Sequence, residues 1–256
     1  MESLTTLLFK VSEHVAYITL NRPTAVNSVS LELAEELHAH AVARECDDSN
    51  SVRAVLLTGA GRIFCGGGDL KSFAAQEPSH LPAHIKRVNL FFHSAIQCFA
   101  RMRAPVVVAV NGPAGGYGMS LASAGDIVLA NESARFTIAY TSVGLTPDAS
   151  STYYLPRIIG LRRTMELALT NRTLAAREAE AIGLVTRVVP DEQLMPQAEA
   201  LANELAHGPT RVWRGETSAV QHSHQSPLRA DGARERIDRG YGAQRRCAGR
   251  YRRVSS

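Results

Sequence analysis

The chain has 256 residues, of which 45% are hydrophobic and 20% are charged, and its formal net charge is +4 at pH 7. This length and composition suffice to bury one sizeable core, so we predict one enzyme-sized domain rather than two separate ones. No stretch approaches the length of a transmembrane helix, and residues 1–8 lack a basic segment followed by an apolar run. We therefore expect a cytoplasmic protein without a membrane partner. The four cysteines lack C-x-x-C spacing, which argues against a disulfide framework or a metal site.

Positive charge is concentrated near the end of the chain. Residues 211–256 contain eleven arginines against four acidic residues, a net charge of +7, which leaves −3 for residues 1–210. A nucleic-acid partner would therefore depend on the tail alone, and we expect none. The tail also loses helical periodicity near Arg211. A solvated basic tail and a shifted reading frame both account for this composition.

The predicted elements alternate between apolar strands and helices in the first half of the chain. In chain order they are a strand over 15–20, a helix opening at 30–37 with Ser30 as its N-cap, a strand over 53–59, a helix over 84–103, and strands over 105–110 and 126–129. The second half is mainly helical, with predicted helices over 149–159, 161–170, 175–182 and 193–207. The pattern predicts an α/β body followed by a helical region.

Two glycine-rich turns follow buried strands. One is the segment 111–118 after the central strand, and the other is the segment 64–71, which opens a helix capped by Asp69. Glycines let the main chain approach a ligand closely, and the first amides of a helix have no internal acceptor. Each turn could aim one N–H group at the same oxygen, as enolate chemistry requires. The alternative is that both turns are only tight connections. No dinucleotide-binding or P-loop glycine motif is present, so a nucleotide site is not predicted.

Several motifs accompany these turns between about Val15 and Pro190. They include Leu20-Asn21-Arg22-Pro23, Phe64-Cys65-Gly66-Gly67-Gly68-Asp69-Leu70, Val110-Asn111-Gly112, Gly125-Asp126-Ile127-Val128, Gly144-Leu145-Thr146-Pro147 and Leu155-Pro156-Arg157. Together they resemble the enoyl-CoA hydratase/isomerase (crotonase) superfamily. The resemblance implies a crotonase-like spiral of ββα units over residues 1–190 and a C-terminal helical region over 191–256, with the atypical tail from about 211. It also implies an acyl-CoA thioester substrate, no separate cofactor because CoA is part of that substrate, and a homotrimer or dimer of trimers.

The resemblance also assigns site residues. The amides of Gly68 and Tyr117 would hold the thioester oxygen, and the substrate would contact Gly66, Asp69, Leu70 and Tyr140. Family hydratases place two glutamates where this chain has Ser120 and Tyr140. Adding water to a double bond needs a base and an acid, so two-carboxylate hydration is not predicted.

A carboxylate does occur at Asp148, directly after Pro147. This pair resembles members of the family that isomerise enoyl-CoA thioesters, in which the aspartate moves a proton between the α- and γ-carbons. An isomerase or hydratase-like lyase with Asp148 as acid/base is the favoured reading. The alternative for this residue is a cap on a helix that begins at Ala149.

The same region also resembles 4-chlorobenzoyl-CoA dehalogenase, in which an aspartate at the position of Asp148 attacks the aromatic ring. His93 would then be the base that activates water. Tyr140 replaces the dehalogenase tryptophan at its position, and Gly68 replaces an aromatic residue. A third alternative, suggested by the two missing glutamates and the altered tail, is a protein that binds acyl-CoA without turning it over.

Overall fold

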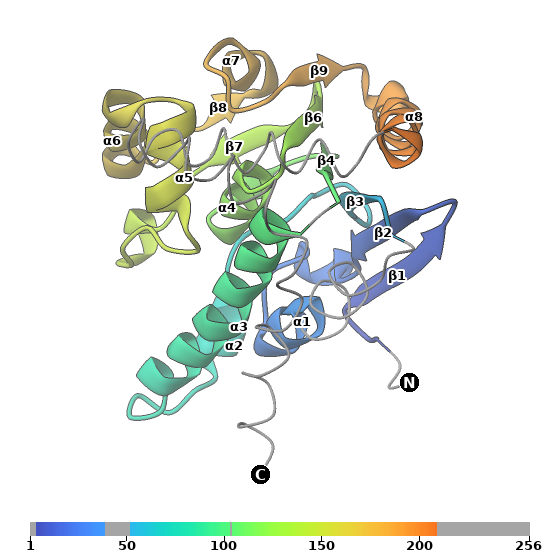
Figure 1. The fold of residues 1–256 in the computed structure, drawn as a ribbon. Coiled ribbons are helices and arrows are strands. Elements are labelled where there is room, and N and C mark those ends of the chain that lie inside the picture. Colours follow the sequence, from blue (N-terminus) through green and yellow to red (C-terminus); the bar gives the residue numbers. More distant parts are fainter. Residues whose placement is uncertain (1–3, 39–51, 103, 209–256) are drawn as a thin grey trace, which may run out of the picture. The chain divides into compact units, whose positions relative to one another are not determined.

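A computed structural model describes residues 4–38, 52–102 and 104–208 (Figure 1). These residues all belong to one compact unit. A six-stranded sheet with the order β1-β2-β3-β4-β6-β9 forms its centre. The strands are β1 (Leu7–Ser12), β2 (Val15–Leu20), β3 (Ala54–Gly59), β4 (Val106–Val110), β6 (Ile127–Asn131) and β9 (Arg187–Val189). Only β1 and β2 pair antiparallel in this sheet, which follows from the two-residue turn that joins them.

Both faces of the sheet are covered, which explains the apolar runs in its central strands. Every residue of β3 and β4 is buried. Because successive side chains of a strand point to opposite faces, alternate residues enter two different cores. Val106 and Val108 face the larger core with Phe92 and Ile96 of α3 (Leu81–Arg101). The intervening strand residues face α8 (Leu194–His207), whose alanines pack closely on β3 and β4.

A smaller sheet lies beside the glycine turns. It consists of β5 (Ala114–Gly115), β7 (Arg135–Thr137) and β8 (Leu174–Ala175). An isolated bridge joins Cys65 to Ala114 and another joins Val29 to Gly68. The glycine turn over 64–71 is therefore paired on both sides with main chain that comes from distant parts of the sequence.

The other helices are short. They are α1 (Leu31–Glu36), α2 (Leu70–Ala74), α4 (Tyr117–Ser123), α5 (Ser151–Ile158), α6 (Leu161–Thr170) and α7 (Ala176–Ala181), with 3₁₀ turns at Pro23–Ala25, Thr141–Val143 and Asp191–Gln193. The predicted caps are confirmed for α1 and α2. Ser30 accepts from the Leu33 amide, and Asp69 accepts from the Ser72 amide at 3.1 Å.

Two predicted helix starts are wrong, and the first of them bears on the site. The helix expected from Ala149 begins at Ser151, because Ala149 and Ser150 have φ angles of +52° and +61°. These left-handed angles cannot continue a right-handed helix. Asp148 accordingly does not cap α5; its Oδ1 accepts from the Ala149 amide at 2.8 Å. The helix predicted from 84 begins earlier, at Leu81.

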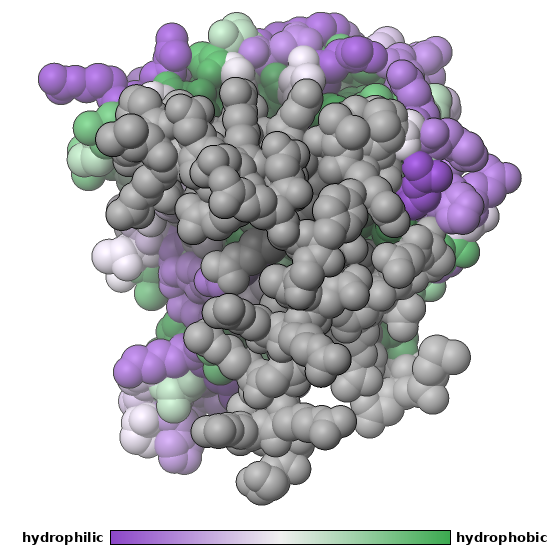
Figure 2. Space-filling view, viewed as in Figure 1, coloured by the Kyte–Doolittle hydropathy of each residue, from purple (hydrophilic) through white to green (hydrophobic). Residues whose placement is uncertain are grey.

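Helix α6 presents an apolar stripe to the surface. Leu161, Met165 and Leu169 follow one another at four-residue spacing and are 65%, 48% and 70% exposed. Figure 2 shows hydrophobic side chains at the upper left, where Figure 1 places α6. The expected C-terminal helical region is present as far as α8, and the arginine-rich tail from about 211 lies outside the described residues.

Candidate active site

The backbones of the two glycine turns lie in close contact. A side chain at Gly118 would place its Cβ 2.2 Å from the Cys65 carbonyl oxygen, and one at Gly67 would place it 3.1 Å from the Gly115 oxygen. Gly67 and Gly116 also have φ angles of +112° and +50°. Only glycine allows both the close backbone approach and the positive φ angles, because it has no Cβ and adopts positive φ at little cost. The close approach brings the two predicted N–H donors into one region.

Gly68 and Tyr117 line one pocket there, together with Gly66, Leu70 and Tyr140. Tyr117 is the first residue of α4, so its amide has no acceptor within the helix. Over the described ranges, neither this amide nor that of Gly68 donates to a backbone carbonyl. Four of the predicted site residues besides Tyr117 therefore share the pocket, and two amides near it are available to a ligand.

Asp69 is placed differently from the other predicted substrate contacts. Its carboxylate caps α2 and forms an ion pair with Arg22 at 2.8 Å. Burial raises the pKa of this carboxyl, but hydrogen bonds from the Ser72 amide and Arg22 outweigh burial and hold the pKa below its usual value. Asp69 supports the turn; a contact between its side chain and substrate stays a prediction.

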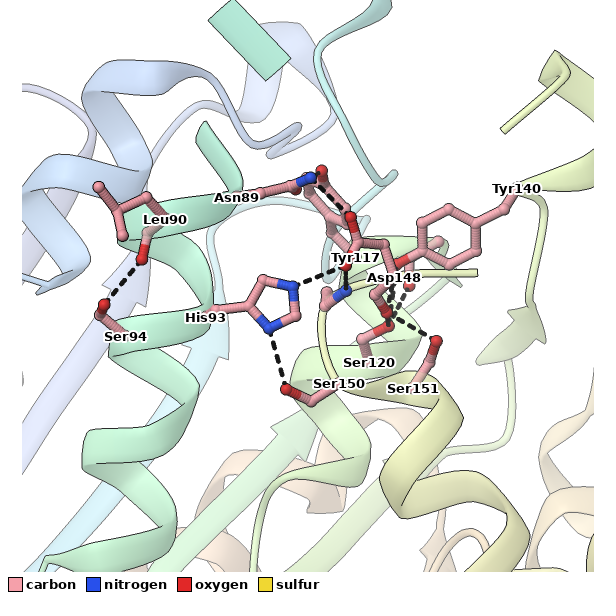
Figure 3. Close-up of polar contacts among 12 residues, drawn as sticks. Asn89, Leu90, His93, Ser94, Tyr117, Ser120, Tyr140, Asp148, Ser150 and Ser151 are labelled. Carbon is pink, nitrogen blue, oxygen red and sulfur yellow. Dashed lines mark hydrogen bonds and ion pairs between the residues drawn. The ribbon is translucent and has the colours of Figure 1, made fainter. Parts of the chain in front are cut away.

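Asp148 and His93 lie side by side, although they come from different elements. His93 projects from α3, and Asp148 precedes the two left-handed residues before α5 (Figure 3). The Nε2 atom of His93 is 2.6 Å from Oδ1 of Asp148. Asn89, one turn earlier on α3, donates from Nδ2 to Oδ2 of Asp148 at 2.6 Å. The carboxylate is thus held by two side chains from one helix face.

These contacts favour the ionised form of Asp148. The hydrogen bond from His93 holds the pKa of Asp148 below its usual value, against the opposing effect of burial and with help from the Ala149 amide and Asn89. An ionised carboxylate only accepts hydrogen bonds, so the Nε2 atom of His93 carries a proton. The other ring nitrogen, Nδ1, lies 3.1 Å from the Ser150 hydroxyl. In neutral His93 this Nδ1 atom accepts a hydrogen bond from the Ser150 hydroxyl.

The main chain at Asp148 is anchored as firmly as its side chain. Its carbonyl oxygen accepts from the Ser151 amide at 3.0 Å, from the Ser151 hydroxyl at 2.6 Å and from the Tyr140 hydroxyl at 3.2 Å. Left-handed conformations at two consecutive non-glycine residues cost roughly 1–2 kcal/mol each. The anchoring bonds offset that cost and hold the Asp148 side chain toward α3.

Two tyrosines that line the pocket also lie close to this aspartate. Tyr117 stacks on Phe92 with ring centres 5.0 Å apart, and its hydroxyl donates to the Asn89 side-chain oxygen. Tyr140 lies 5.9 Å from the Tyr117 ring, and its hydroxyl is 3.0 Å from the Ser120 hydroxyl. Burial raises the pKa of both phenols. Both tyrosines are therefore neutral hydroxyls. The Tyr117 ring lies next to Gly68, since a Cβ on that glycine would be 3.8 Å from it.

A family model described as enoyl-CoA hydratase/isomerase matches residues 10–237. The chain belongs to this family. It is 39% identical over 206 residues to 1,2-epoxyphenylacetyl-CoA isomerase from Escherichia coli, covering 80% of this chain and 77% of the relative. It is 38% identical over 201 residues to 4-chlorobenzoyl coenzyme A dehalogenase-2 from Arthrobacter, covering 78% and 72%.

Solved structures give the same assignment. Enoyl-CoA hydratase from Bacillus anthracis superposes with a TM-score of 0.84 at 31% identity, covering 93% of this chain and 91% of the other. This likeness confirms the predicted crotonase-like α/β fold. Ser120 and Tyr140, which the resemblance places at the positions of the two hydratase glutamates, have their hydroxyls 3.0 Å apart, and neither residue has a carboxylate.

Sequence reasoning missed two polar neighbours of the pair, Asn89 and Ser150. A signal was available for the first, because Asn89 precedes His93 by four residues and must share its helix face. Ser150 carried no such signal.

Over the described residues, no cluster of three metal-ligating side chains is found, and no described helix is long and apolar enough to cross a membrane.

Proposed function

We propose that this protein is an enoyl-CoA isomerase or a related lyase, with Asp148 as its acid/base and the Gly68 and Tyr117 amides as donors to the thioester oxygen. One observation carries the proposal. Tyr117 lines the pocket that holds both amides, and its side chain leads through Asn89 to the Asp148 carboxylate. The thioester would enter the pocket, and CoA would be part of the substrate rather than a separate cofactor.

The two amides would supply the electrostatic part of the chemistry. When a proton leaves the acyl chain, negative charge moves onto the thioester oxygen. Donors that already point at this oxygen stabilise the charge without having to reorganise, which typically changes the rate by 10²–10³-fold per donor. The close main-chain contact between Gly67 and Gly115 supports this role, because it restricts both turns.

Asp148 would supply the proton transfer. A 1,3-shift needs one group that removes a proton from one carbon and returns it to another, so a single carboxylate suffices. The depressed pKa of Asp148 keeps it ionised at neutral pH and ready to accept a proton. Two-carboxylate hydration has less support, since Ser120 and Tyr140 are neutral and are bonded to each other.

Turnover of a panel of 2-enoyl- and 3-enoyl-CoA thioesters in D₂O tests the proposal. We expect interconversion of the two isomers with deuterium incorporated at the α- or γ-carbon. Tight binding of these thioesters without turnover or exchange would instead indicate an acyl-CoA-binding protein. Hydration products would point to a lyase that draws its second proton donor from elsewhere.

Dehalogenation of an aryl-CoA is the second candidate, and the His93–Asp148 contact favours it. Asp148 would attack the ring carbon that bears the halogen, halide would leave, and His93 would take a proton from the water that hydrolyses the aryl ester. Tyr140 bonds to the main-chain oxygen of Asp148 rather than to its carboxylate. The contact made by the dehalogenase tryptophan is thus not supplied by Tyr140. Release of chloride from 4-chlorobenzoyl-CoA would support this candidate.

We also propose that the protein assembles as a trimer or a dimer of trimers. The stripe of Leu161, Met165 and Leu169 on α6 supports this, because large exposed apolar side chains in a row favour association.

A further inference from the structure

Asn89 is the middle member of three hydrogen-bonded side chains, and it links Tyr117 of the pocket to the Asp148 carboxylate. Its oxygen accepts from the Tyr117 hydroxyl, and its nitrogen donates to Oδ2 of Asp148 at 2.6 Å (Figure 3). Tyr117 is 4% exposed and stacks on Phe92, so its hydroxyl has a fixed position. The three groups come from α3, α4 and the loop before α5.

The orientation of the Asn89 amide is determined by both neighbours. The Asp148 carboxylate can only accept, so the amide nitrogen must face it and the amide oxygen must face Tyr117. The phenol of Tyr117 then donates its single proton to that oxygen. If the Tyr117 hydroxyl were absent, the Asn89 oxygen would lose its hydrogen-bond donor. The amide could then rotate until its oxygen faces the Asp148 carboxylate, and the two oxygens would repel each other.

The two oxygens of Asp148 differ in the number of donors that they accept. Oδ1 accepts from His93 Nε2 at 2.6 Å and from the Ala149 amide at 2.8 Å, which fills both of its lone-pair directions. Oδ2 accepts only from Asn89 among the described residues. Oδ2 therefore keeps one lone pair for a substrate proton, and its one donor, Asn89, also contacts Tyr117, a residue that lines the pocket.

We propose that Asn89, held by the Tyr117 hydroxyl, is a positioning residue that keeps Oδ2 of Asp148 facing the pocket as the reacting oxygen. This inference rests on the proposed role of Asp148 as acid/base. Tyr117 then serves both parts of the site, since its amide is one expected oxyanion donor and its hydroxyl orients the residue that holds the base. Asn89 itself need not touch the substrate.

Three variants and one control test this arrangement. Asn89→Leu removes the amide at similar size, Tyr117→Phe removes only the hydroxyl, and the double variant removes both. Ser94→Ala is the matched control, because Ser94 lies on the same helix and, within the part of the chain that the structure describes, its hydroxyl bonds only to the Leu90 carbonyl. Thermal unfolding of each variant confirms that it is folded.

The first measurement is the pH profile of turnover. Asn89→Leu should lower kcat on the plateau by about tenfold with KM changed less than about twofold, since a carboxylate that is no longer held spends less time in the reactive geometry. The acidic limb should move to higher pH, because a donor that stabilised the ionised form is gone. The Tyr117→Phe change should act in the same direction and more weakly. The profile of Ser94→Ala should match that of the original protein.

The second measurement needs no turnover. A water-soluble carbodiimide with an added amine modifies protonated carboxyls, so the pH at which Asp148 becomes labelled, read by mass spectrometry, reports its protonation. We expect the labelling midpoint to move to higher pH in Asn89→Leu, and to move no further in the double variant, because Tyr117 acts through Asn89. An unmoved midpoint in Asn89→Leu, or a full additional shift in the double variant, would overturn the inference. A shifted midpoint in a protein that isomerises no enoyl-CoA would overturn the proposed function alone.

Discussion

The Nε2 atom of His93 lies 2.6 Å from Oδ1 of Asp148, across 55 positions of sequence. The contact joins the middle of the long helix α3 to a loop whose next two residues have positive φ. It joins one carboxylate and one imidazole by a hydrogen bond, so that loss of the His93 donor is expected to raise the pKa of Asp148.

Replacing Asp148 with asparagine should abolish most turnover while leaving the fold intact. The change removes the group that accepts the proton, and loss of a positioned acid/base typically costs 10²–10⁴-fold in kcat. The new amide can still accept from the Ala149 amide, and the Asn89 amide can rotate to face it. Steady-state kinetics with the best enoyl-CoA, together with thermal unfolding, checks this. Full activity in the variant would leave Asp148 a purely structural role.

Replacing His93 with glutamine should separate the two candidate reactions. An isomerase that uses Asp148 as its base should lose little activity, because glutamine can still donate to Oδ1. A dehalogenase should instead accumulate an aryl ester on Asp148, because hydrolysis has lost its base. Intact-mass spectrometry after incubation with 4-chlorobenzoyl-CoA detects this adduct. An unmodified His93→Gln protein that still releases chloride repeatedly would argue against His93 as the base.

The ionised form of Asp148 should contribute to stability above the ordinary carboxyl range and not below it. Its pKa is depressed in the folded state, chiefly by the hydrogen bond from His93. The contribution is therefore complete above the unfolded pKa of about 4 and is lost as the pH falls through the lower folded pKa. Its size should be modest, because the side chain is 35% exposed.

Urea unfolding of the original protein and of Asp148→Asn across this pH range measures the effect. The difference in the free energy of unfolding between the two should be constant above about pH 5 and should shrink at lower pH. Titration of the other carboxyls cancels in this comparison. A difference that stays constant down to about pH 3 would contradict the depressed pKa.

Replacing Gly68 with proline should lower kcat by about 10²-fold, because proline has no N–H to donate to the thioester oxygen. Gly68→Ala is the matched control. It keeps the amide, and its Cβ would lie 3.1 Å from the edge of the Phe73 ring, which can shift by a few tenths of an ångström. If both variants lose activity equally, the effect is steric and the amide is not a donor.

Replacing Leu161 and Leu169 with lysine should weaken the proposed assembly. Both side chains are largely exposed, at 65% and 70%, so the change should not disturb the fold of one subunit. Sedimentation at micromolar concentration should show trimers or hexamers of the original protein and smaller species of the double variant. A monomeric original protein would count against the proposed assembly.

Local sequence determined much of this protein. The glycine turns, the buried strands, and the Ser30 and Asp69 caps depend on neighbours within a few residues, and each lies where the pattern predicts it. The family motifs were sufficient for the α/β fold. His93 and Asp148 were both candidates from sequence, although their mutual contact could not be read from it.

Tertiary structure decided how the candidates meet. Asn89 contacts Tyr117 across 28 positions and Asp148 across 59, and both contacts require α3, α4 and the loop before α5 to pack together. The left-handed angles of Ala149 and Ser150 follow from the same packing, since neither residue favours them alone. Helical spacing and strand alternation describe contacts within one element, whereas the choice between the two Asp148 oxygens depends on donors from separate elements. Only the folded chain brings those donors to one carboxylate.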